Sequence, residues 1–301
     1  MFAVPPLEAL VRAGHEVSLV VTQPDRPKGR GLDMALSPVK QKALELGLAI
    51  AQPEKIRNNA EFRAQLESLS PRAIAIVGYG RIVPRWMLDL PPLGNINLHA
   101  SLLPKYRGAA PIQWAIAEGE QVTGNTTMRI DEGLDTGDIL LQREMTIQPN
   151  DNSMTLAPRL AAMSAELLAE TLAALDEGRL HATPQDHTLA SLARILTRED
   201  GRVDFSSEAQ KIWNRHRGFQ PWPGAFTTFR GKQLTLHAIS VSESGALAAG
   251  ELAVAGERVI AGCGAGTTIA IDELQLEGKR RMSAREFING YQPKPGERVG
   301  I

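Results

Sequence analysis

Apolar residues in the first half of the chain alternate between two patterns. Short, almost continuous apolar runs rich in β-branched residues are typical of strands that are covered on both faces. Strands are predicted at 15–23, 72–80, 94–101 and 124–131. Helical spacing of apolar residues predicts helices at 37–48 and 59–70, the first with a Ser37 cap followed by Pro38. This alternation predicts an α/β fold with an open, mostly parallel, Rossmann-like sheet.

The pattern changes in the second half. A long Ala- and Leu-rich helix is predicted at 155–180, and a polar stretch without periodicity follows at 181–200. Beyond it, short β-like runs are separated by glycines, which is typical of a small β-barrel of the OB-like kind. We therefore expect a first domain over 1–180, a linker over 181–200 and a smaller barrel domain over 201–301.

Composition narrows the class of protein. The 301-residue chain has a net charge of −1, which excludes a simple polycationic nucleic-acid binder but not one that uses a local basic patch. Its single cysteine, Cys263, excludes a disulfide framework within the chain, and no spacing typical of metal ligands is present. There is no apolar run of membrane-spanning length and no signal peptide, so we expect a cytoplasmic protein.

One predicted strand carries candidate chemistry. Asn97 and His99 are two residues apart near the end of the run 94–101, so their side chains point to the same face about 7 Å apart, and Leu98 points to the other. Ligands of open parallel sheets bind beyond the carboxyl ends of the strands. We expect the loops at 78–81 and 131–139 to lie at the same edge.

These loops bring a carboxylate to the pair. His99 can exchange a proton near neutral pH, Asn97 can donate to a developing oxyanion, and Asp135 can orient the imidazole. No serine or cysteine nucleophile is placed beside a base. The set suits direct acyl or formyl transfer between two substrates. The alternative that Asn97 and His99 are structural, and that Asp135 belongs to a surface turn, stays open. The remaining histidines are interpreted as surface or packing residues: His15, His181, His187, His216 and His237.

Longer motifs then point to a family. The stretches "NINLHASLLPKYRGAAPIQWAI" (95–116) and "GLDTGDIL" (133–140) resemble the formyltransferases that use 10-formyltetrahydrofolate. Further stretches resemble the branch of that family that formylates initiator methionyl-tRNA: "TQPDRPKGRG" (22–31), "SPVKQKA" (37–43) and "FQPWPGAFT" (219–227). The resemblance covers essentially the whole chain.

The resemblance implies a reaction and its residues. The α-amino group of methionine on the initiator tRNA would attack the formyl carbon, with Asn97, His99 and Asp135 as the catalytic residues. The co-substrate 10-formyltetrahydrofolate would be bound by two segments, and no metal is expected. These folate-facing residues are Ser101, Leu102, Leu103 and Pro104, together with Arg81, Ile82 and Val83.

The resemblance also implies contacts with tRNA. Arg26, Lys28 and Arg30 lie in the loop that it assigns to the acceptor end of the tRNA. Taken alone, this loop is more typical of a solvated surface, but a polyanionic substrate favours phosphate contacts. The barrel domain would also hold tRNA, and its densest basic run is 278–285. We expect a cytoplasmic monomer that acts in translation initiation.

The beginning of the chain departs from the family pattern. The family opens with a strand and a Gly-Thr-Pro turn before the helix that corresponds to "FAVPPLEALVRAG" (2–14), whereas this sequence starts within that helix. Because that strand is central in the family's sheet, we expect unpaired strand edges here. A start site assigned too late would explain this, and we expect the 301-residue chain to be less stable or less active than one extended upstream.

Two other functions remain open. A formyltransferase that acts on another amine, such as a nucleotide sugar, would share both domains, whereas glycinamide ribonucleotide enzymes resemble only the first. A non-catalytic RNA-binding protein of a different class would tolerate the loss of His99.

Overall fold

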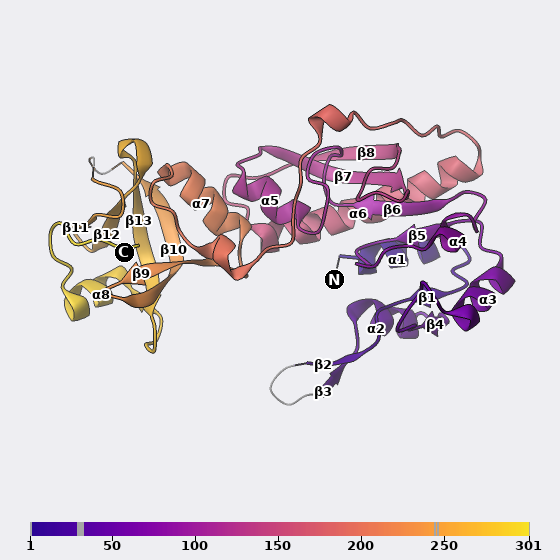
Figure 1. The fold of residues 1–301 in the computed structure, drawn as a ribbon, viewed down its shortest axis with the longest axis horizontal. Coiled ribbons are helices and arrows are strands. Elements are labelled where there is room, and N and C mark those ends of the chain that lie inside the picture. Colours follow the sequence, from indigo (N-terminus) through magenta and orange to yellow (C-terminus); the bar gives the residue numbers. More distant parts are fainter. Residues whose placement is uncertain (1, 29–32, 244, 246, 301) are drawn as a thin grey trace. The chain divides into compact units, whose positions relative to one another are not determined.

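The structure is a computed structural model that describes residues 2–28, 33–243, 245 and 247–300, and it divides into two compact units (Figure 1). Unit 1 comprises residues 1–111, 122–146 and 157–194, and unit 2 comprises 112–121, 147–156 and 195–301. Each unit is therefore assembled from three separate segments of the chain.

Unit 1 contains the predicted alternation of strands and helices. Its strands are β1 (Val20–Val21), β2 (Arg26–Lys28), β3 (Asp33–Ala35), β4 (Ile50–Ala51), β5 (Ile74–Ile76), β6 (Asn95–His99), β7 (Val122–Arg129) and β8 (Ile139–Thr146). Its helices are α1 (Val4–Arg12), α2 (Pro38–Glu45), α3 (Ala60–Leu69), α4 (Arg85–Leu88), the 3-10 turn η1 (His187–Leu189) and most of α6 (Ser153–Asp176).

Local signals in the sequence explain where these helices begin. The Ser37 hydroxyl accepts the backbone N–H of Lys40 at 3.1 Å, with Pro38 at the first helical position, as predicted for α2. The Asn59 side chain caps α3 in the same way by accepting from Phe62 N at 2.9 Å. Leu168, Leu172 and Leu175 of α6 pack on Ile96 and Leu140, so one apolar stripe of the helix covers the sheet.

The strands of unit 1 form a mixed arrangement. β5 and β6 are parallel, and so are β1 and β4, but β7 is antiparallel to both β6 and β8. Strand β8 was not predicted. Among the described residues, β1 pairs only with β4 and β5 only with β6, so the expected open edges are present.

Unit 2 is built on one antiparallel sheet. Its strands are β9 (Ala225–Phe229), β10 (Lys232–Ser242), β11 (Leu252–Ala255), β12 (Arg258–Gly262), β13 (Thr268–Leu276) and β14 (Met282–Ser283), in the order β11-β12-β13-β10-β9 with β14 beside β13. Its helices are most of α5 (Pro111–Ala117), α7 (Ala209–Gly218), α8 (Ala284–Tyr291), and the 3-10 turns η2 (Arg198–Gly201) and η3 (Gly264–Gly266).

The predicted barrel is not closed by direct pairing of its two edge strands in the described part of the chain. Segment 297–300 instead bonds to both edges. Its Val299 N–H donates to Gly250 O beside β11, and its Gly300 N–H donates to Thr228 O in β9, both at 2.9 Å. Backbone carbonyls at both edges of the sheet are therefore hydrogen-bonded to an irregular segment. This limits the pairing of these edges with other chains.

None of the helices in the described ranges is both long enough and apolar enough to span a bilayer.

Candidate active site

Strand β6 places polar and apolar residues on opposite faces. Ile96 belongs to the cluster beneath α6, and Leu98 is also buried. Asn95, Asn97 and His99 alternate with them and share the other face. Asn95 has a structural task there, because its amide donates to the carbonyls of Met87 and Leu88 in α4 at 2.8 and 3.1 Å. Asn95 was not among the residues predicted for the site.

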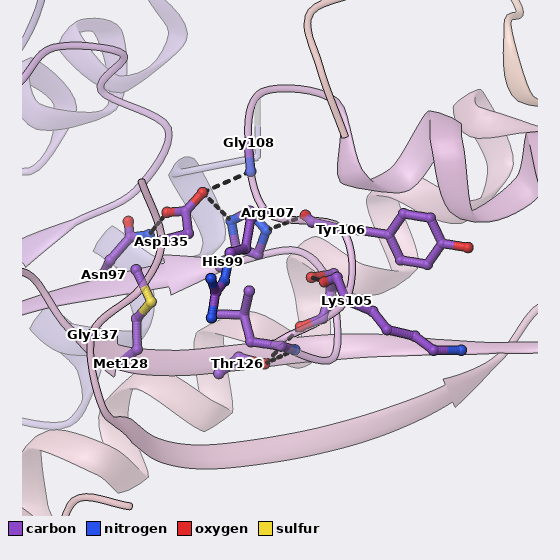
Figure 2. Close-up of polar contacts among 12 residues, drawn as sticks. Asn97, His99, Lys105, Tyr106, Arg107, Gly108, Thr126, Met128, Asp135 and Gly137 are labelled. Atoms are coloured by element: carbon purple, nitrogen blue, oxygen red, sulfur yellow. Dashed lines mark hydrogen bonds and ion pairs between the residues drawn. The ribbon is translucent and has the colours of Figure 1, made fainter. Parts of the chain in front are cut away.

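Asp135 joins the other two polar residues of β6. Figure 2 shows its carboxylate between Asn97 and His99. One oxygen accepts from Asn97 Nδ2 at 3.3 Å, and the other lies 3.6 Å from His99 Nδ1. The second oxygen also accepts the backbone N–H of Gly108 at 2.8 Å. The structure therefore brings together the three residues predicted from the sequence.

Asp135 reaches this position by a route other than the expected one. Because β7 is antiparallel to β6, its carboxyl end lies beside the beginning of β6, with Arg129 paired to Ile96. The assumption that the loop 131–139 starts at the carboxyl edge of β6 was therefore wrong. The loop instead turns back so that Asp135 meets Asn97 and His99.

The partners of His99 define its protonation. Its Nε2 lies 2.8 Å from Tyr106 O, and a carbonyl can only accept, so Nε2 carries a hydrogen. In the neutral ring, Nδ1 is then the nitrogen with the lone pair. It faces the Asp135 carboxylate at 3.6 Å, beyond hydrogen-bond length but close enough for a favourable charge interaction when the ring is protonated. The side chain is 7% exposed, so water screens this interaction little.

The loops around the site contain unusual backbone conformations. Tyr106 and Asp135 have positive φ values of 61° and 52°. Two glycines permit the close approach of neighbouring chain. A Cβ on Gly137 would lie 1.9 Å from Arg129 O, and one on Gly108, with φ of 114°, would lie 2.8 Å from Ala193 O. No side chain fits at either position without moving the backbone.

The predicted folate-facing turn at 101–104 is tied to the neighbouring strands. The buried Ser101 hydroxyl donates to Lys105 O at 2.7 Å, and Thr126 Oγ1 accepts from Leu103 N at 3.1 Å. Leu103 is buried as well, whereas Leu102 and Pro104 are partly exposed. Two of the four predicted side chains are therefore accessible on this turn.

The second predicted folate segment follows β5. Because β5 and β6 are parallel neighbours, the loops that follow them start at the same edge. Arg81 donates to Gln23 Oε1 at 2.8 Å, and Val83 packs into the core beside β5. Ile82 is 88% exposed, the highest value among the exposed large apolar residues that the structure describes.

The predicted tRNA loop lies on the β2–β3 hairpin, which extends beyond α2 (Figure 1). Arg26 is exposed, the backbone of Lys28 pairs with Asp33, and Arg30 lies outside the described residues. Asp25 at the base of the hairpin bonds to Lys40 of α2 and to Gln52, and these contacts, led by the Lys40 ammonium, lower the pKa of the Asp25 carboxyl. The sequence motifs at 22–31 and 37–43 are therefore in contact through Asp25 and Lys40.

The basic run 278–285 in unit 2 is matched by acidic neighbours. Ion pairs link Arg280 to Glu286, Arg281 to Glu273 and Arg285 to Glu257. All are exposed surface pairs, which contribute little stability but reduce the positive potential of the run. The number of basic residues in the run 278–285 therefore overstates how strongly this segment would attract phosphate.

Comparison with known proteins identifies the family. A family model described as "Formyl transferase" matches residues 3–172, and one described as "Formyl transferase, C-terminal domain" matches 195–292. The chain belongs to the formyl transferase family. No group of three or more His, Cys, Asp or Glu side chains that could hold a metal was found in the described parts of this formyl transferase.

Curated relatives narrow the branch of the formyl transferase family. The chain is 62% identical to a protein of Koribacter versatilis named methionyl-tRNA formyltransferase, over 99% of this chain and 96% of the relative. Relatives of the same name from Acidobacterium capsulatum and Solibacter usitatus are 60% and 52% identical, each over 99% of this chain and 96% of theirs.

Solved structures share the formyl transferase fold at low identity. An N-formyltransferase from Helicobacter canadensis, in complex with folinic acid and dTDP-3-aminofucose, matches with a TM-score of 0.66 and 18% identity, over 90% of this chain and 95% of that one. HypX from Aquifex aeolicus, in complex with tetrahydrofolic acid, matches with a TM-score of 0.57 and 18% identity, over 84% of this chain and 44% of that one.

Two buried residues beside the site could not be recognised from the sequence. Arg107 was seen only as part of the motif, and Gln185 lies in the polar stretch predicted to be a linker. Both are buried and bonded to each other, with Arg107 Nη2 2.6 Å from Gln185 Oε1. The stretch around Gln185 is also paired with the rest of unit 1, because Thr183 exchanges backbone hydrogen bonds with Ile139.

Proposed function

We propose that this protein transfers the formyl group of 10-formyltetrahydrofolate to the α-amino group of methionine on initiator methionyl-tRNA. The contact of Asn97 and His99 with the Asp135 carboxylate carries the proposal, because it supplies an amide donor and a proton-exchanging pair at one point. Relatives that are 46–62% identical over nearly the whole chain bear the name of this activity, which favours it over sugar modification or non-catalytic RNA binding.

The reaction needs a donor for negative charge and an acceptor for a proton. The amine nitrogen forms a bond to the formyl carbon and yields a tetrahedral oxyanion. Asn97 uses one amide hydrogen on Asp135 and has a second for this oxygen, and His99 supports the same charge once its ring has accepted a proton. The amine loses a proton to the His99–Asp135 pair through Nδ1 of the ring. When the oxyanion collapses and the bond from carbon to the folate nitrogen breaks, that nitrogen takes the proton that His99 accepted from the amine, so charge and atoms balance.

The folate site is assigned to the two loops at the carboxyl edge of β5 and β6. Ile82 exposes almost its whole side chain there, and Leu102 and Pro104 are partly exposed on the neighbouring loop. Exposed apolar side chains suit the face of a flat heteroaromatic ring. Folate compounds in complexes of fold relatives support this choice of co-substrate. Ser101 and Leu103 serve this site by shaping the turn from within.

The tRNA acceptor end is assigned to the β2–β3 hairpin, with Arg26, Lys28 and Arg30 as its phosphate contacts. The hairpin is anchored at Asp25 to Lys40 and extends beyond α2, so it has a fixed base. We assign the protein to the cytoplasm, where charged tRNA is used in translation initiation, and we propose that it acts as a monomer.

The decisive experiment compares acceptors. Purified full chain is incubated with 10-formyltetrahydrofolate and either charged initiator tRNA, charged elongator methionine tRNA or an amino-sugar nucleotide. We expect formylmethionine on the initiator tRNA alone. Formylation of the sugar nucleotide without formylation of tRNA would replace the proposal, and no product with any acceptor would reject it.

A further inference from the structure

A glutamine outside the catalytic set connects the two loops that hold it. Gln185 is 6% exposed and sits two residues before the η1 turn. Its amide nitrogen donates to Asp135 O at 3.0 Å and to Gly137 O at 2.7 Å. Its amide oxygen accepts from the Arg107 Nε and Nη2 at 3.2 and 2.6 Å.

These four contacts use the full hydrogen-bonding capacity of the amide. An amide nitrogen has two hydrogens and an amide oxygen two lone pairs. The guanidinium can only donate and the two carbonyls can only accept, so the side chain fits in one orientation. A fully satisfied buried amide of this kind fixes its neighbours, because any displacement leaves polar groups without partners.

Arg107 carries the connection to His99. Its neighbours on both sides contact the catalytic set: Tyr106 O accepts from His99 Nε2, and Gly108 N–H donates to Asp135. The guanidinium is buried, and its Nη2 also lies 3.1 Å from His187 Nδ1. Figure 2 shows the Gly108 N–H directed at the Asp135 carboxylate and the Tyr106 carbonyl directed at the imidazole.

The loops joined by Gln185 need external support. Asp135 and Tyr106 both have the positive φ that costs a non-glycine residue conformational energy, and such conformations persist only when surrounding contacts fix them. The Nδ1–carboxylate separation of 3.6 Å would grow if either loop relaxed.

We propose that Gln185 is a positioning residue for formyl transfer, acting through the backbone of Asp135 to hold the carboxylate against His99. This inference rests on the proposed function and deepens it. Gln185 does not touch the reacting atoms. It determines where the carboxylate stands when the amine loses its proton.

Two substitutions separate its contacts. Gln185→Met keeps the length of the side chain and removes all four hydrogen bonds. Gln185→Glu keeps the acceptor for Arg107 but loses both donors, so it isolates the contacts with Asp135 O and Gly137 O. Thr188→Ala is the matched control, because it removes the capping contact of Thr188 Oγ1 with Asp186 in the adjacent turn and leaves the Gln185 amide intact.

The measurements are kcat and KM for initiator methionyl-tRNA and for the folate, with thermal unfolding alongside. We expect both Gln185 variants to lower kcat about 10- to 100-fold with KM values near wild type, because a misplaced group costs rate rather than binding. Thr188→Ala should keep wild-type kcat. In the double variant with Asp135→Asn, Gln185→Met should cost little beyond Asp135→Asn alone, since the carboxylate it positions is already gone.

Several outcomes would overturn the proposal. Wild-type kcat in Gln185→Glu would do so, as would a loss that simply multiplies with that of Asp135→Asn. If Gln185→Met does not fold, Gln185→Glu decides the matter, because it retains the bond to Arg107. An inactive wild-type chain would instead reject the proposed function itself, and this inference with it.

Discussion

Two buried histidines, one in each unit, have opposite surroundings. His99 in unit 1 faces the Asp135 carboxylate, with Nδ1 3.6 Å from a carboxylate oxygen. His216 in unit 2 is 9% exposed and bonds to the backbone of Leu236 and His237 and to Gln220. Burial lowers the pKa of His216, and the backbone bonds only partly oppose this shift. Burial alone therefore does not mark a functional histidine. What distinguishes His99 is the carboxylate opposite its second ring nitrogen.

The most direct test of this comparison replaces each histidine with glutamine. His99→Gln should lower kcat for formylation about 10²- to 10⁴-fold, the range typical of a lost acid–base group. His216→Gln should leave kcat near wild type, since its ring serves packing in unit 2. Steady-state formylation of initiator methionyl-tRNA measures both. Equal losses in the two variants would show that the carboxylate does not distinguish them.

The second test removes the carboxylate and keeps the histidine. Asp135→Asn preserves the shape of the side chain but not the charge that stabilises a protonated His99. We expect kcat to fall about 10- to 100-fold, as for other groups that orient and charge-stabilise a reactive neighbour. Glu132→Gln, a charge loss on the same loop at a side chain that pairs with exposed Arg85, is the control and should retain activity.

The third test disturbs the loop that carries the carboxylate. In Gly137→Ala, the new methyl group would lie 1.9 Å from Arg129 O, so the loop must move. We expect a loss of about 1–3 kcal/mol in the free energy of unfolding, as for other overpacked sites, together with reduced kcat. Gly290→Ala in α8, where a Cβ meets nothing within 4 Å, should instead gain about 0.5–1 kcal/mol. Urea unfolding measures both, and a wild-type stability in Gly137→Ala would contradict the close approach.

The fourth test uses pH. Because the folded-state pKa of His216 is below its ordinary value of 6.5, the unfolded chain binds this proton more readily as pH falls below about 6.5. His216 therefore lowers the stability of unit 2 by up to about 1.4 kcal/mol per pH unit between 6.5 and its folded value. His216→Gln should lose less stability than wild type between pH 7.5 and 5.5. An unchanged pH dependence, compared with exposed His181→Gln, would argue against the lowered pKa.

The smallest expected effect on activity is that of replacing Cys263, the single thiol in unit 2. Burial raises the pKa of Cys263 to about 11, so the thiolate needed for alkylation is scarce at neutral pH. We expect iodoacetamide to label the native chain slowly and the urea-unfolded chain quickly. Cys263→Ala should keep wild-type kcat, consistent with a packing role for this region. Fast labelling of native protein would show that the core of unit 2 opens readily.

Strand β6 and the meeting of Asn97 and His99 with Asp135 could be predicted because much of their signal is local. The apolar run of β6 and the two-residue spacing of Asn97 and His99 are visible within a few letters. The direction of β7 could not be predicted, since the sequence around it does not reveal whether it runs parallel or antiparallel to β6. After the buried Leu140, strand β8 alternates partly buried and exposed residues, including Arg143 and Glu144, and lacks the long apolar run that marked the others.

Gln185 shows the limit of such reasoning more clearly. Its hydrogen-bond partners lie 50 residues away at Asp135 and 78 residues away at Arg107. Nothing near it in the chain indicates burial, because its neighbours are polar and exposed. Only the tertiary fold converts a glutamine in a polar stretch into a fully bonded element of the site.

Segment 297–300, which bonds to both edges of the sheet in unit 2, has a consequence for biosynthesis. Chains emerge from the ribosome in sequence order, and this segment follows all the strands of its unit. The edges at β9 and β11 therefore lack their hydrogen-bond partner until translation has passed residue 300. During that interval the nascent unit exposes two strand edges to neighbouring chains, so its vulnerability to aggregation is greatest late in synthesis.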